Sequence, residues 1–332
     1  MDITHAVPPN RLSVGFVLTR DFTLSAFANF VDVLRLAADE GDRSRRIHCD
    51  WQVLSADMNP IVSSAGVRIQ PDTRLRLAGR FDYIVVVGGL IGRGETLTPE
   101  LVTYLRENAE AGVPLVGLCT GVFQLYAAGL LEGYRACVSW FHHRDFTDRF
   151  AGATPVSNQI FVVDRDRLTC SGGHSAAHLA AFVVERHLGQ VAAAKSLSIL
   201  MIDGAQSGER PQPALPETPP ARDPVVRKAL IRMQQSIDEP ESIPDLARQL
   251  GVGRKTLERR FRDDLGAPPS RIAMDLRLDH AARLLAGSTR SVTDIALACG
   301  FCDVPHLIRA FRKRHGMTPG DFRQAHASVA AP

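Results

Sequence analysis

Continuous apolar runs recur along the first two hundred residues of the chain and predict buried β-strands. The runs lie at residues 13–18, 51–55, 83–87 and 114–118. Segments with the spacing of amphipathic helices lie between or after them, at residues 25–38, 99–111, 122–131 and 175–188. Uninterrupted apolar strands are typical of parallel strands covered on both faces, so the alternation predicts a doubly wound, mostly parallel α/β sheet. Ligands bind such sheets beyond the carboxyl ends of the strands.

The last hundred residues show no strand pattern and contain an internal repeat instead. The repeated blocks are 242–247 with 291–296, and 257–262 with 307–312. Each copy predicts a helix capped by its first serine, a tight turn centred on Gly251 or Gly300, and a second helix. Such helix-turn-helix units place the second helix in the major groove of DNA. The alternative is a pair of helical hairpins without a nucleic-acid role, and basic outward residues at matching sites argue against it.

Length and composition agree with two domains of different character. At roughly 100–200 residues per domain, 332 residues predict two domains, and a hydrophobic content of 45% excludes a disordered chain. Six cysteines are too few for a disulfide scaffold. Residues 221–332 carry 19 Lys/Arg and 13 Asp/Glu, whereas the remainder has a net charge of −3. A basic tail on an acidic body indicates nucleic acid bound by the tail, with a solvated basic face as the simpler alternative.

A segment rich in Pro, Gly and Ser, residues 204–224, predicts an extended and semi-stiff linker. It separates a predicted ligand-sensing and dimerisation domain, residues 11–203, from a predicted DNA-binding domain, residues 225–326. The apolar run at 14–18 is too short for a signal sequence, and no stretch approaches the 18 apolar residues of a transmembrane helix. We therefore expect a cytoplasmic protein that does not bind membranes.

The outward face of each predicted second helix supplies the candidate DNA-binding residues. In the first copy these are Arg254, Lys255, Thr256, Glu258 and Arg259. In the second copy Asp303 is expected to cap the helix, and Pro305 in the first turn has no N–H to donate, so this helix is expected to read fewer bases. Apolar positions between residues 272 and 285 predict a connecting helix that holds both second helices on one side of the duplex.

These residues resemble the AraC/XylS family of transcription regulators. The resemblance covers residues 225–326 and rests on residues 291–301 and on Leu307, Arg309, Ala310, Phe311, Gly316, Thr318 and Pro319. It implies that both second helices read adjacent major-groove segments of promoter DNA, and that RNA polymerase is a further partner. The reading positions that it implies are Lys255, Glu258 and Arg259 in the first copy and Val304, Pro305, His306 and Arg309 in the second.

In the body, residues 117–121 (Gly-Leu-Cys-Thr-Gly) follow a predicted strand and begin a helix. This spacing is typical of a nucleophile elbow, and the helix N-terminus is expected to lower the pKa of Cys119. Together with Gly88, Gly89 and residues 31–35, the motif resembles the class I glutamine amidotransferase-like superfamily, ThiJ/PfpI branch, over most of residues 11–200.

Enzymes of that branch need a carboxylate from the first helix and an imidazole beyond the elbow helix. The corresponding positions hold Ala26 and Ser139, so an activated nucleophile is not expected and Cys119 is a vestigial residue that lines a pocket. One of His142, His143 and His174 could substitute in space. That leaves an alternative reading of the chain, a ThiJ/PfpI-like hydrolase or lyase that uses Cys119 and carries an accessory DNA-binding tail.

ThiJ/PfpI-like bodies fused to AraC-type tails form a group of regulators, several of which respond to small nitrogen compounds such as amino acids, betaines or carnitine. The expected ligand-binding residues are Cys119, Trp140, Phe141, His174 and Ser175. The two aromatic rings offer faces to a cationic amine, and residues 172–175 begin a helix whose free N–H groups can hold a carboxylate. The alternatives are core packing for the aromatic residues, and ordinary surface or core histidine against zinc ligation for His174 and His178.

The pair Cys299 and Cys302 has the spacing of half a zinc or redox site, but no second pair exists in the chain. We therefore expect no metal and no cofactor. The sequence as a whole predicts a homodimeric, ligand-responsive, DNA-binding transcriptional regulator that activates catabolic genes for a small nitrogen-containing metabolite. A metabolite-binding module without a DNA role is a third reading, which the repeat opposes.

Overall fold

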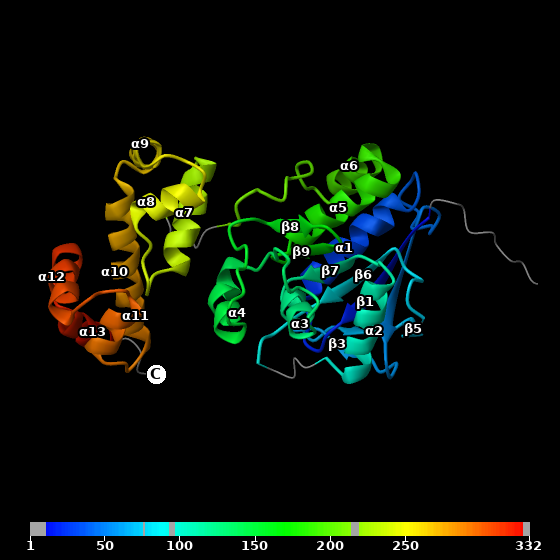
Figure 1. Cartoon of the computed structure of the whole chain (residues 1–332), viewed down its shortest axis with the longest axis horizontal. Coiled ribbons are helices and arrows are strands. Elements are labelled where there is room, and N and C mark those ends of the chain that lie inside the picture. The colour runs from blue at the N-terminus through cyan, green and yellow to red at the C-terminus, as the bar shows by residue number, and fades with distance from the viewer. Residues whose placement is uncertain (1–10, 76, 93–96, 214–218, 328–332) are drawn as a thin grey trace, which may run out of the picture. The chain divides into compact units, whose positions relative to one another are not determined.

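A computed structural model describes residues 11–75, 77–92, 97–213 and 219–327. The chain forms two compact units, Met1–Gln212 and Pro213–Pro332, and each is considered by itself (Figure 1). Among the described residues no helix is both long and apolar enough to cross a membrane.

The first unit is built on a seven-stranded sheet with the order β5-β2-β1-β6-β7-β9-β8. The strands are β1 (Leu12–Leu18), β2 (Cys49–Ser55), β5 (Thr73–Arg74), β6 (Tyr83–Val87), β7 (Leu115–Leu118), β8 (Phe161–Asp164) and β9 (Arg167–Cys170). Neighbouring strands are parallel except for β8, the edge strand, which runs antiparallel to β9. The predicted mostly parallel α/β sheet is confirmed. A separate two-stranded ribbon pairs β3 (Ile61–Val62) with β4 (Arg68–Ile69).

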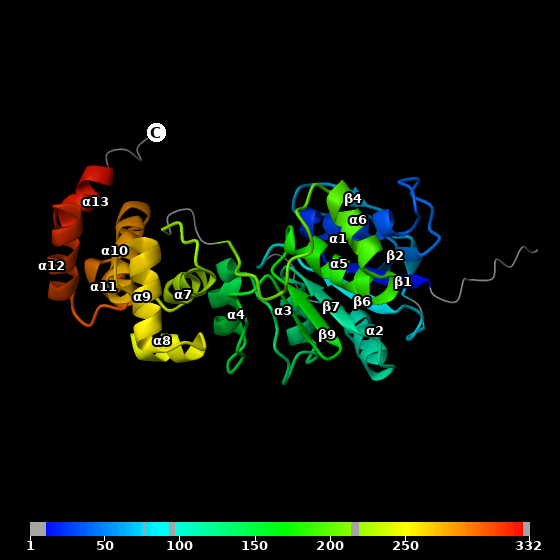
Figure 2. The same ribbon diagram turned by 90° about the horizontal axis from the view of Figure 1, so that it is seen from above.

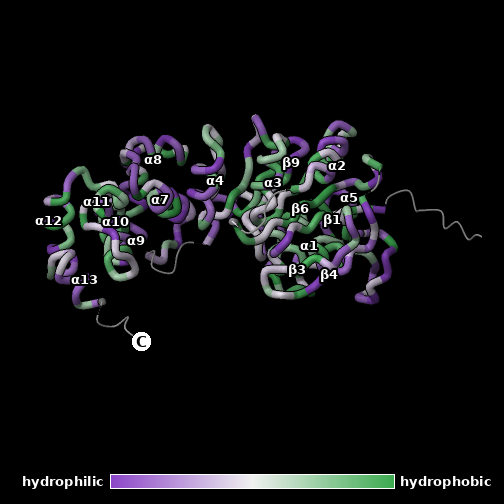
Figure 3. The backbone as a smooth tube through the Cα atoms, turned by 90° about the horizontal axis from the view of Figure 1, so that it is seen from below, coloured by the Kyte–Doolittle hydropathy of each residue, from purple (hydrophilic) through white to green (hydrophobic). Residues whose placement is uncertain are grey.

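Helices cover both faces of this sheet, so each face has its own apolar core (Figures 1 and 2). One core joins the strands to α1 (Leu24–Ala37), α5 (Ser175–Leu188) and α6 (Gln190–Ile199). The other joins them to α2 (Pro99–Glu110), α3 (Gly121–Ala127) and α4 (His143–Arg149), which follows the short 3-10 helix Trp140–His142. Because both faces are buried, β6 consists only of apolar residues and tyrosine, and Figure 3 shows it as hydrophobic.

Helix α3 ends at Ala127, earlier than the predicted 131, because Gly129 adopts a positive φ of 76° and the chain turns. The sequence pattern also missed the shortest elements of the first unit, namely β3, β4, β5, β8, β9 and α4, together with α6. Strands of two to four residues carry too few side chains for a periodic pattern to be detected.

The start of the predicted linker belongs structurally to the first unit. Residues 205–212, here named the strap, lie beside the start of β8. Ile160 N, one residue before the strand, donates to Gly208 O (3.1 Å) and Arg210 O (2.9 Å). Gln212 is 2% exposed at the end of the strap. The segment between the two packed units is therefore shorter than the 204–224 that the composition suggests. Residues 214–218 lie outside the described residues.

The second unit is entirely helical within the part that the structure describes. Its helices are α7 (Pro224–Gln235), α8 (Ile243–Gln249), α9 (Arg254–Leu265), α10 (Pro269–Gly287), α11 (Val292–Ala298), α12 (Val304–His315) and α13 (Pro319–Ala327). One apolar core holds α7, α8 and α9 and a second holds α11 and α12. The predicted connecting helix is α10, which supplies Ile272 and Leu276 to the first core and Ala281 and Leu285 to the second.

Candidate nucleic-acid interface and effector region

The first helix-turn-helix consists of α8 and α9 and begins with the predicted cap. Ser242 Oγ accepts a hydrogen bond from Asp245 N (3.3 Å), and its own hydroxyl donates to Asp245 Oδ2 (2.6 Å). Gly251 turns the chain with a φ of 69°. These contacts satisfy the free N–H groups at the helix start and set the direction of α9.

The predicted reading face of α9 is largely open. Arg254, Lys255 and Arg259 are exposed, whereas Thr256 and Glu258 are half-buried. Arg254 Nε donates to Glu258 Oε1 (2.8 Å), and this bond lowers the pKa of Glu258 below its usual range. Figure 3 shows α9 as mostly hydrophilic. The predicted reading residues of α9 thus include one ion pair and two cations, Lys255 and Arg259, that have no ion-pair partner among the described residues.

The second helix-turn-helix, α11 and α12, repeats the same local chemistry. Ser291 Oγ accepts from Asp294 N (3.0 Å), and Gly300 has a φ of 68°. Asp303 caps α12 as predicted, because its Oδ1 accepts from His306 N (2.6 Å), and Pro305 lies in the first turn.

The predicted reading face of α12 is less open than that of α9. Val304 packs against the second core, and the His306 ring stands edge-on to Phe301, with 5.3 Å between the ring centroids. Arg309 is exposed, and the described residues offer its side chain no hydrogen-bond or ion-pair partner. Of the four predicted reading positions of this copy, Val304 and His306 pack against neighbouring residues, whereas Pro305 and Arg309 are exposed.

Arg277 on α10 ties the turn of the second copy to the connecting helix. Its Nε donates to Cys299 O (2.7 Å), its Nη2 donates to Gly300 O, and its guanidinium lies 4.2 Å from the ring centroid of Phe301. Sequence reasoning missed this residue, since nothing in its spacing shows that it faces the turn. Cys299 is buried here while Cys302 is exposed.

In the first unit, Cys119 has the geometry of an elbow residue. Its φ of 56° is unusual for a residue other than glycine, and it lies between β7 and α3. Thr23 Oγ1, just before α1, donates to Cys119 Sγ (3.3 Å). Gly172 also lies close to the thiol, since a Cβ at that glycine would be 3.0 Å from Cys119 Sγ.

Burial raises the pKa of the Cys119 thiol, although the bond from Thr23 opposes the shift. The expectation that the helix N-terminus lowers this pKa is therefore wrong, because the loss of hydration outweighs the favourable N–H groups. Ala26 is fully buried, and Ser139 Oγ accepts from Phe141 N (3.4 Å). Thr23 is the only side-chain hydrogen-bond partner of the thiol among the described residues.

The three candidate substitute histidines have other positions or partners. His142 Nδ1 lies 2.8 Å from Asp145 Oδ2 and His143 Nδ1 lies 2.9 Å from Ser157 Oγ, while His174 is exposed. His142 and His143 thus each have a partner other than Cys119, whose side-chain hydrogen bond comes from Thr23.

The predicted ligand-binding residues divide into two groups. Ser175 donates to Gly172 O (2.7 Å), so it shares the loop that covers Cys119. Trp140 N donates to Gln212 Oε1 (2.9 Å), and the ring of Phe141, 68% exposed, contacts Trp140 and His142. In the part of the chain that the structure describes, no hydrogen bond or ring contact joins Trp140 or Phe141 to Cys119.

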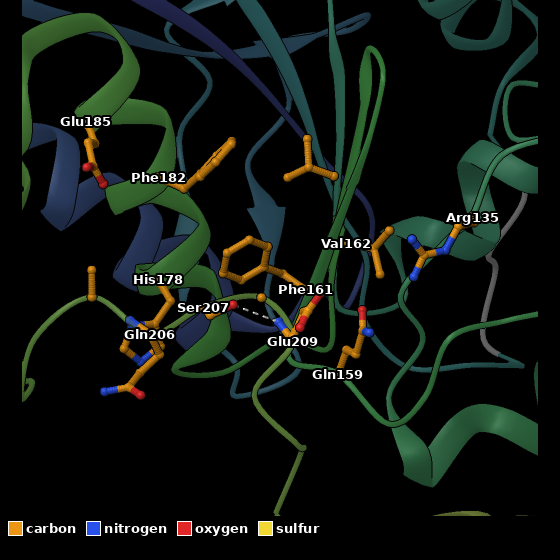
Figure 4. Close-up of a pocket in the computed structure, with 13 residues that line it drawn as sticks. Arg135, Gln159, Phe161, Val162, His178, Phe182, Glu185, Gln206, Ser207 and Glu209 are labelled. Atoms are coloured by element: carbon orange, nitrogen blue, oxygen red, sulfur yellow. Dashed lines mark hydrogen bonds between the residues drawn. The ribbon is translucent and has the colours of Figure 1, made fainter. Parts of the chain in front are cut away.

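Two cavities lie elsewhere in the first unit, and none of the five predicted ligand residues lines either of them. One, of about 490 Å³, lies beyond the carboxyl ends of β1 and β2 and beside the start of α2. The other, of about 420 Å³, lies between α5, β8 and the strap, and is named the strap cleft (Figure 4). Sequence reasoning missed the strap cleft, because the composition of the strap predicts an extended linker and not a packed segment.

An α/β sensor-like unit and a double helix-turn-helix unit on one chain define a DNA-binding transcription regulator. Residues 14–186 match the DJ-1/PfpI family and residues 246–325 match a helix-turn-helix domain. The chain is 32% identical over 322 residues to the HTH-type transcriptional regulator GbdR of Pseudomonas aeruginosa, covering 96% of this chain and 86% of GbdR. The chain thus belongs to the AraC-family transcriptional regulators with an N-terminal DJ-1/PfpI domain.

Two further likenesses concern the first unit. Over 163 residues the chain is 31% identical to an isonitrile hydratase of Pseudomonas putida, a match that covers 49% of this chain and 65% of the enzyme. The crystal structure of a ThiJ/PfpI family protein from Pseudomonas syringae matches with a TM-score of 0.50 and 19% identity, covering 70% of this chain and 93% of that one. The second likeness shows the fold alone.

Proposed function

We propose that this regulator is ligand-responsive, that its first unit senses a small nitrogen-containing metabolite, and that it activates catabolic genes as a homodimer. The observation that carries the DNA-binding part is the pair of matched helix-turn-helix copies, each with an exposed arginine, Arg259 or Arg309, on its second helix. Two such helices on one chain fit adjacent major-groove segments, and two chains held together raise the effective concentration of the second tail.

Control by the first unit is tested with two proteins, the full chain and the tail alone, residues 221–332. Operator DNA is titrated with each at fixed salt, in the presence and absence of ligand. A ligand shifts an equilibrium only by its different affinity for two states, so it should change the affinity of the full chain and leave the tail unaffected. A tail that responds to ligand as the full chain does would overturn the assignment of sensing to the first unit.

We further propose that Cys119 performs no catalysis. Support comes from its raised pKa, from Ala26 at the carboxylate position and from the absence of a histidine partner among the described contacts of the thiol. Cys119→Ala should leave operator affinity unchanged, and both proteins should lack hydratase or hydrolase activity. A covalent acyl or thioimidate adduct at Cys119, trapped by mass spectrometry with a nitrile, isonitrile or ester substrate, would instead favour the enzyme reading.

The region of Cys119, Trp140 and residues 172–175 remains a proposed place for the effector. Cys119→Ser and Trp140→Ala should then weaken binding of ligand by the full chain without changing operator affinity in its absence.

A further inference from the structure

A second region of the first unit has the size and position of a small-molecule site. The cavity of about 490 Å³ beyond the carboxyl ends of β1 and β2, here named the carboxyl-end cavity, shares no lining residue with the effector region around Cys119 or with the strap cleft. Small-molecule sites usually have volumes of about 300–1,000 Å³, and a cavity of about 150 Å³ already holds benzene. The carboxyl ends of parallel strands are also where α/β sheets bind their ligands.

The floor of the carboxyl-end cavity is aliphatic. Val17 and Leu54 are paired across β1 and β2, so their side chains point to the same face of the sheet, the face that α2 covers. They are 2% and 1% exposed. Leu75, which follows β5, packs on the same core and also lines the cavity. The floor therefore offers hydrocarbon to a ligand.

A further wall comes from the start of α2. Leu97, just before the helix cap Thr98, and Leu101 in the first turn both line the cavity and are half-buried, although they pack against the core of this face. Half-covered leucines leave apolar surface that a ligand can bury. None of the described residues that line the cavity is aromatic, so the cavity offers no ring face for stacking. These walls fit an aliphatic chain.

The carboxylate among the described lining residues already has hydrogen-bond partners. Asp57 Oδ1 accepts from Ser55 Oγ (3.0 Å) and from Asn59 N (3.0 Å), and Asp57 Oδ2 accepts from Asn59 Nδ2 (2.8 Å). These bonds lower the pKa of Asp57, because they favour its charged form. A cationic ligand would have to compete with all three bonds.

Arg20, by contrast, is a cation with little compensation. Its side chain is 80% exposed at the cavity, and the ion-pair partner that the described residues give it, Asp21 Oδ2, lies 4.0 Å from Arg20 Nε. A guanidinium presents several N–H donors in a fork that matches a carboxylate. Apolar walls together with one available cation define a ligand with an aliphatic body and a single negative charge.

We propose that the carboxyl-end cavity binds a medium-chain aliphatic monocarboxylate, with its chain along Val17 and Leu54 and its carboxylate at the Arg20 guanidinium. This ligand differs in charge and polarity from the small nitrogen compounds proposed for the effector region. The inference therefore adds a second binding site to the function proposed above, and either site can exist without the other.

Binding is tested by calorimetric titration of the full chain with straight-chain carboxylates from butanoate to decanoate. Affinity should rise about fourfold for each added methylene until the chain fills the cavity. Octylammonium has the same chain and the opposite charge, and octanoate should bind at least about tenfold more tightly. The proposal is overturned if no carboxylate binds, if affinity does not depend on chain length, or if octylammonium binds as well as octanoate.

The location is tested by filling the cavity from two sides. Ala56→Leu adds bulk beside the end of β2 and Leu97→Trp adds it before α2, so one variant remains informative if the other does not fold. Each should weaken octanoate at least about tenfold. Leu200→Phe, at a half-buried leucine that packs on the other face of the sheet, is the matched control and should leave binding unchanged. The cavity is excluded if the folded filled variants bind octanoate as the parent does, or if Cys119→Ala abolishes binding.

The position of the carboxylate is tested at the cavity rim. Arg20→Gln should weaken octanoate about fivefold and leave the affinity for octan-1-ol unchanged, because the alcohol has no charge for the guanidinium to meet. Arg43→Gln, at an exposed arginine that does not line the cavity, is the control and should change neither affinity. Equal losses for octanoate and octan-1-ol in Arg20→Gln, or no loss for octanoate, would overturn the role of Arg20.

Discussion

The two helix-turn-helix copies share their local chemistry and differ in how their surroundings use it. Both have a serine cap, a turn glycine near φ 70° and a second helix of 12 residues. The turn of the first copy is open, because a Cβ at Gly251 would meet nothing within 4 Å. The turn of the second copy is enclosed, because a Cβ at Gly300 would lie 2.5 Å from Ile237 O.

The difference extends to the reading helices. Helix α9 keeps Lys255 and Arg259 exposed, whereas α12 uses Val304 and His306 for packing and leaves Arg309 exposed. The second copy is thus built into the unit more firmly and offers fewer polar groups to bases. The repeated sequence gives both copies the same helix-turn-helix motif. The elements packed against each copy determine which of its side chains stay exposed for DNA.

The largest effect is expected from the turn glycines. Gly300→Ala combines the cost of a left-handed residue with overlap against backbone, and should lower the free energy of unfolding of the second unit by about 3–5 kcal/mol. Gly251→Ala adds only the conformational cost, about 1–2 kcal/mol. Urea unfolding followed by circular dichroism measures both, and equal losses would contradict the enclosed turn of the second copy.

Features of the fold and the site could be predicted from the sequence where several residues together form a recognisable pattern. The parallel sheet, the repeat, the connecting helix and the cap by Asp303 came from patterns of several residues each. Arg277, the strap and the strap cleft did not, because each depends on partners far apart in the chain, such as Gln212 with Val138. The raised pKa of Cys119 was missed for the same reason, since burial is set by the loop at Gly172.

The next effect concerns the tie between α10 and the enclosed turn. Arg277→Met keeps an apolar stem over Phe301 and loses the bonds to Cys299 O and Gly300 O, which should cost about 2–3 kcal/mol. Arg271→Met, which removes an exposed ion pair with Asp275, is the control and should cost less than about 0.5 kcal/mol. The free energy of unfolding distinguishes the two, and similar losses would remove the special role of Arg277.

The exposed arginines of α9 and α12 are expected to contribute differently to operator binding. Arg259→Ala and Arg309→Ala should each cost about 1–3 kcal/mol in operator binding at fixed salt if each reads a guanine. Because α12 has one such residue, Arg309→Ala should also make its half of the operator insensitive to base changes, whereas Arg259→Ala leaves Lys255 to discriminate. Affinities for operators mutated in either half measure this. Unchanged affinity in both variants would show that the reading helices are misassigned.

The smallest expected effect is a difference between the two copies in how their stability depends on pH. His315 at the end of α12 packs on Phe311 with 4.3 Å between centroids, where the first copy has Leu265, and its buried Nε2 has no hydrogen-bond partner among the described residues. Burial lowers the pKa of His315 in the folded state. The unfolded chain therefore binds the proton first as the pH falls below about 6.5, and this histidine's contribution to stability, complete above that pH, is lost on acidification. His315→Leu should reduce the decrease in the urea midpoint between pH 7 and pH 5, while Leu265→Ile in the first copy should leave that difference as it is. An equal loss of midpoint in the parent and in the His315→Leu variant would assign the acid sensitivity of the second unit to other groups.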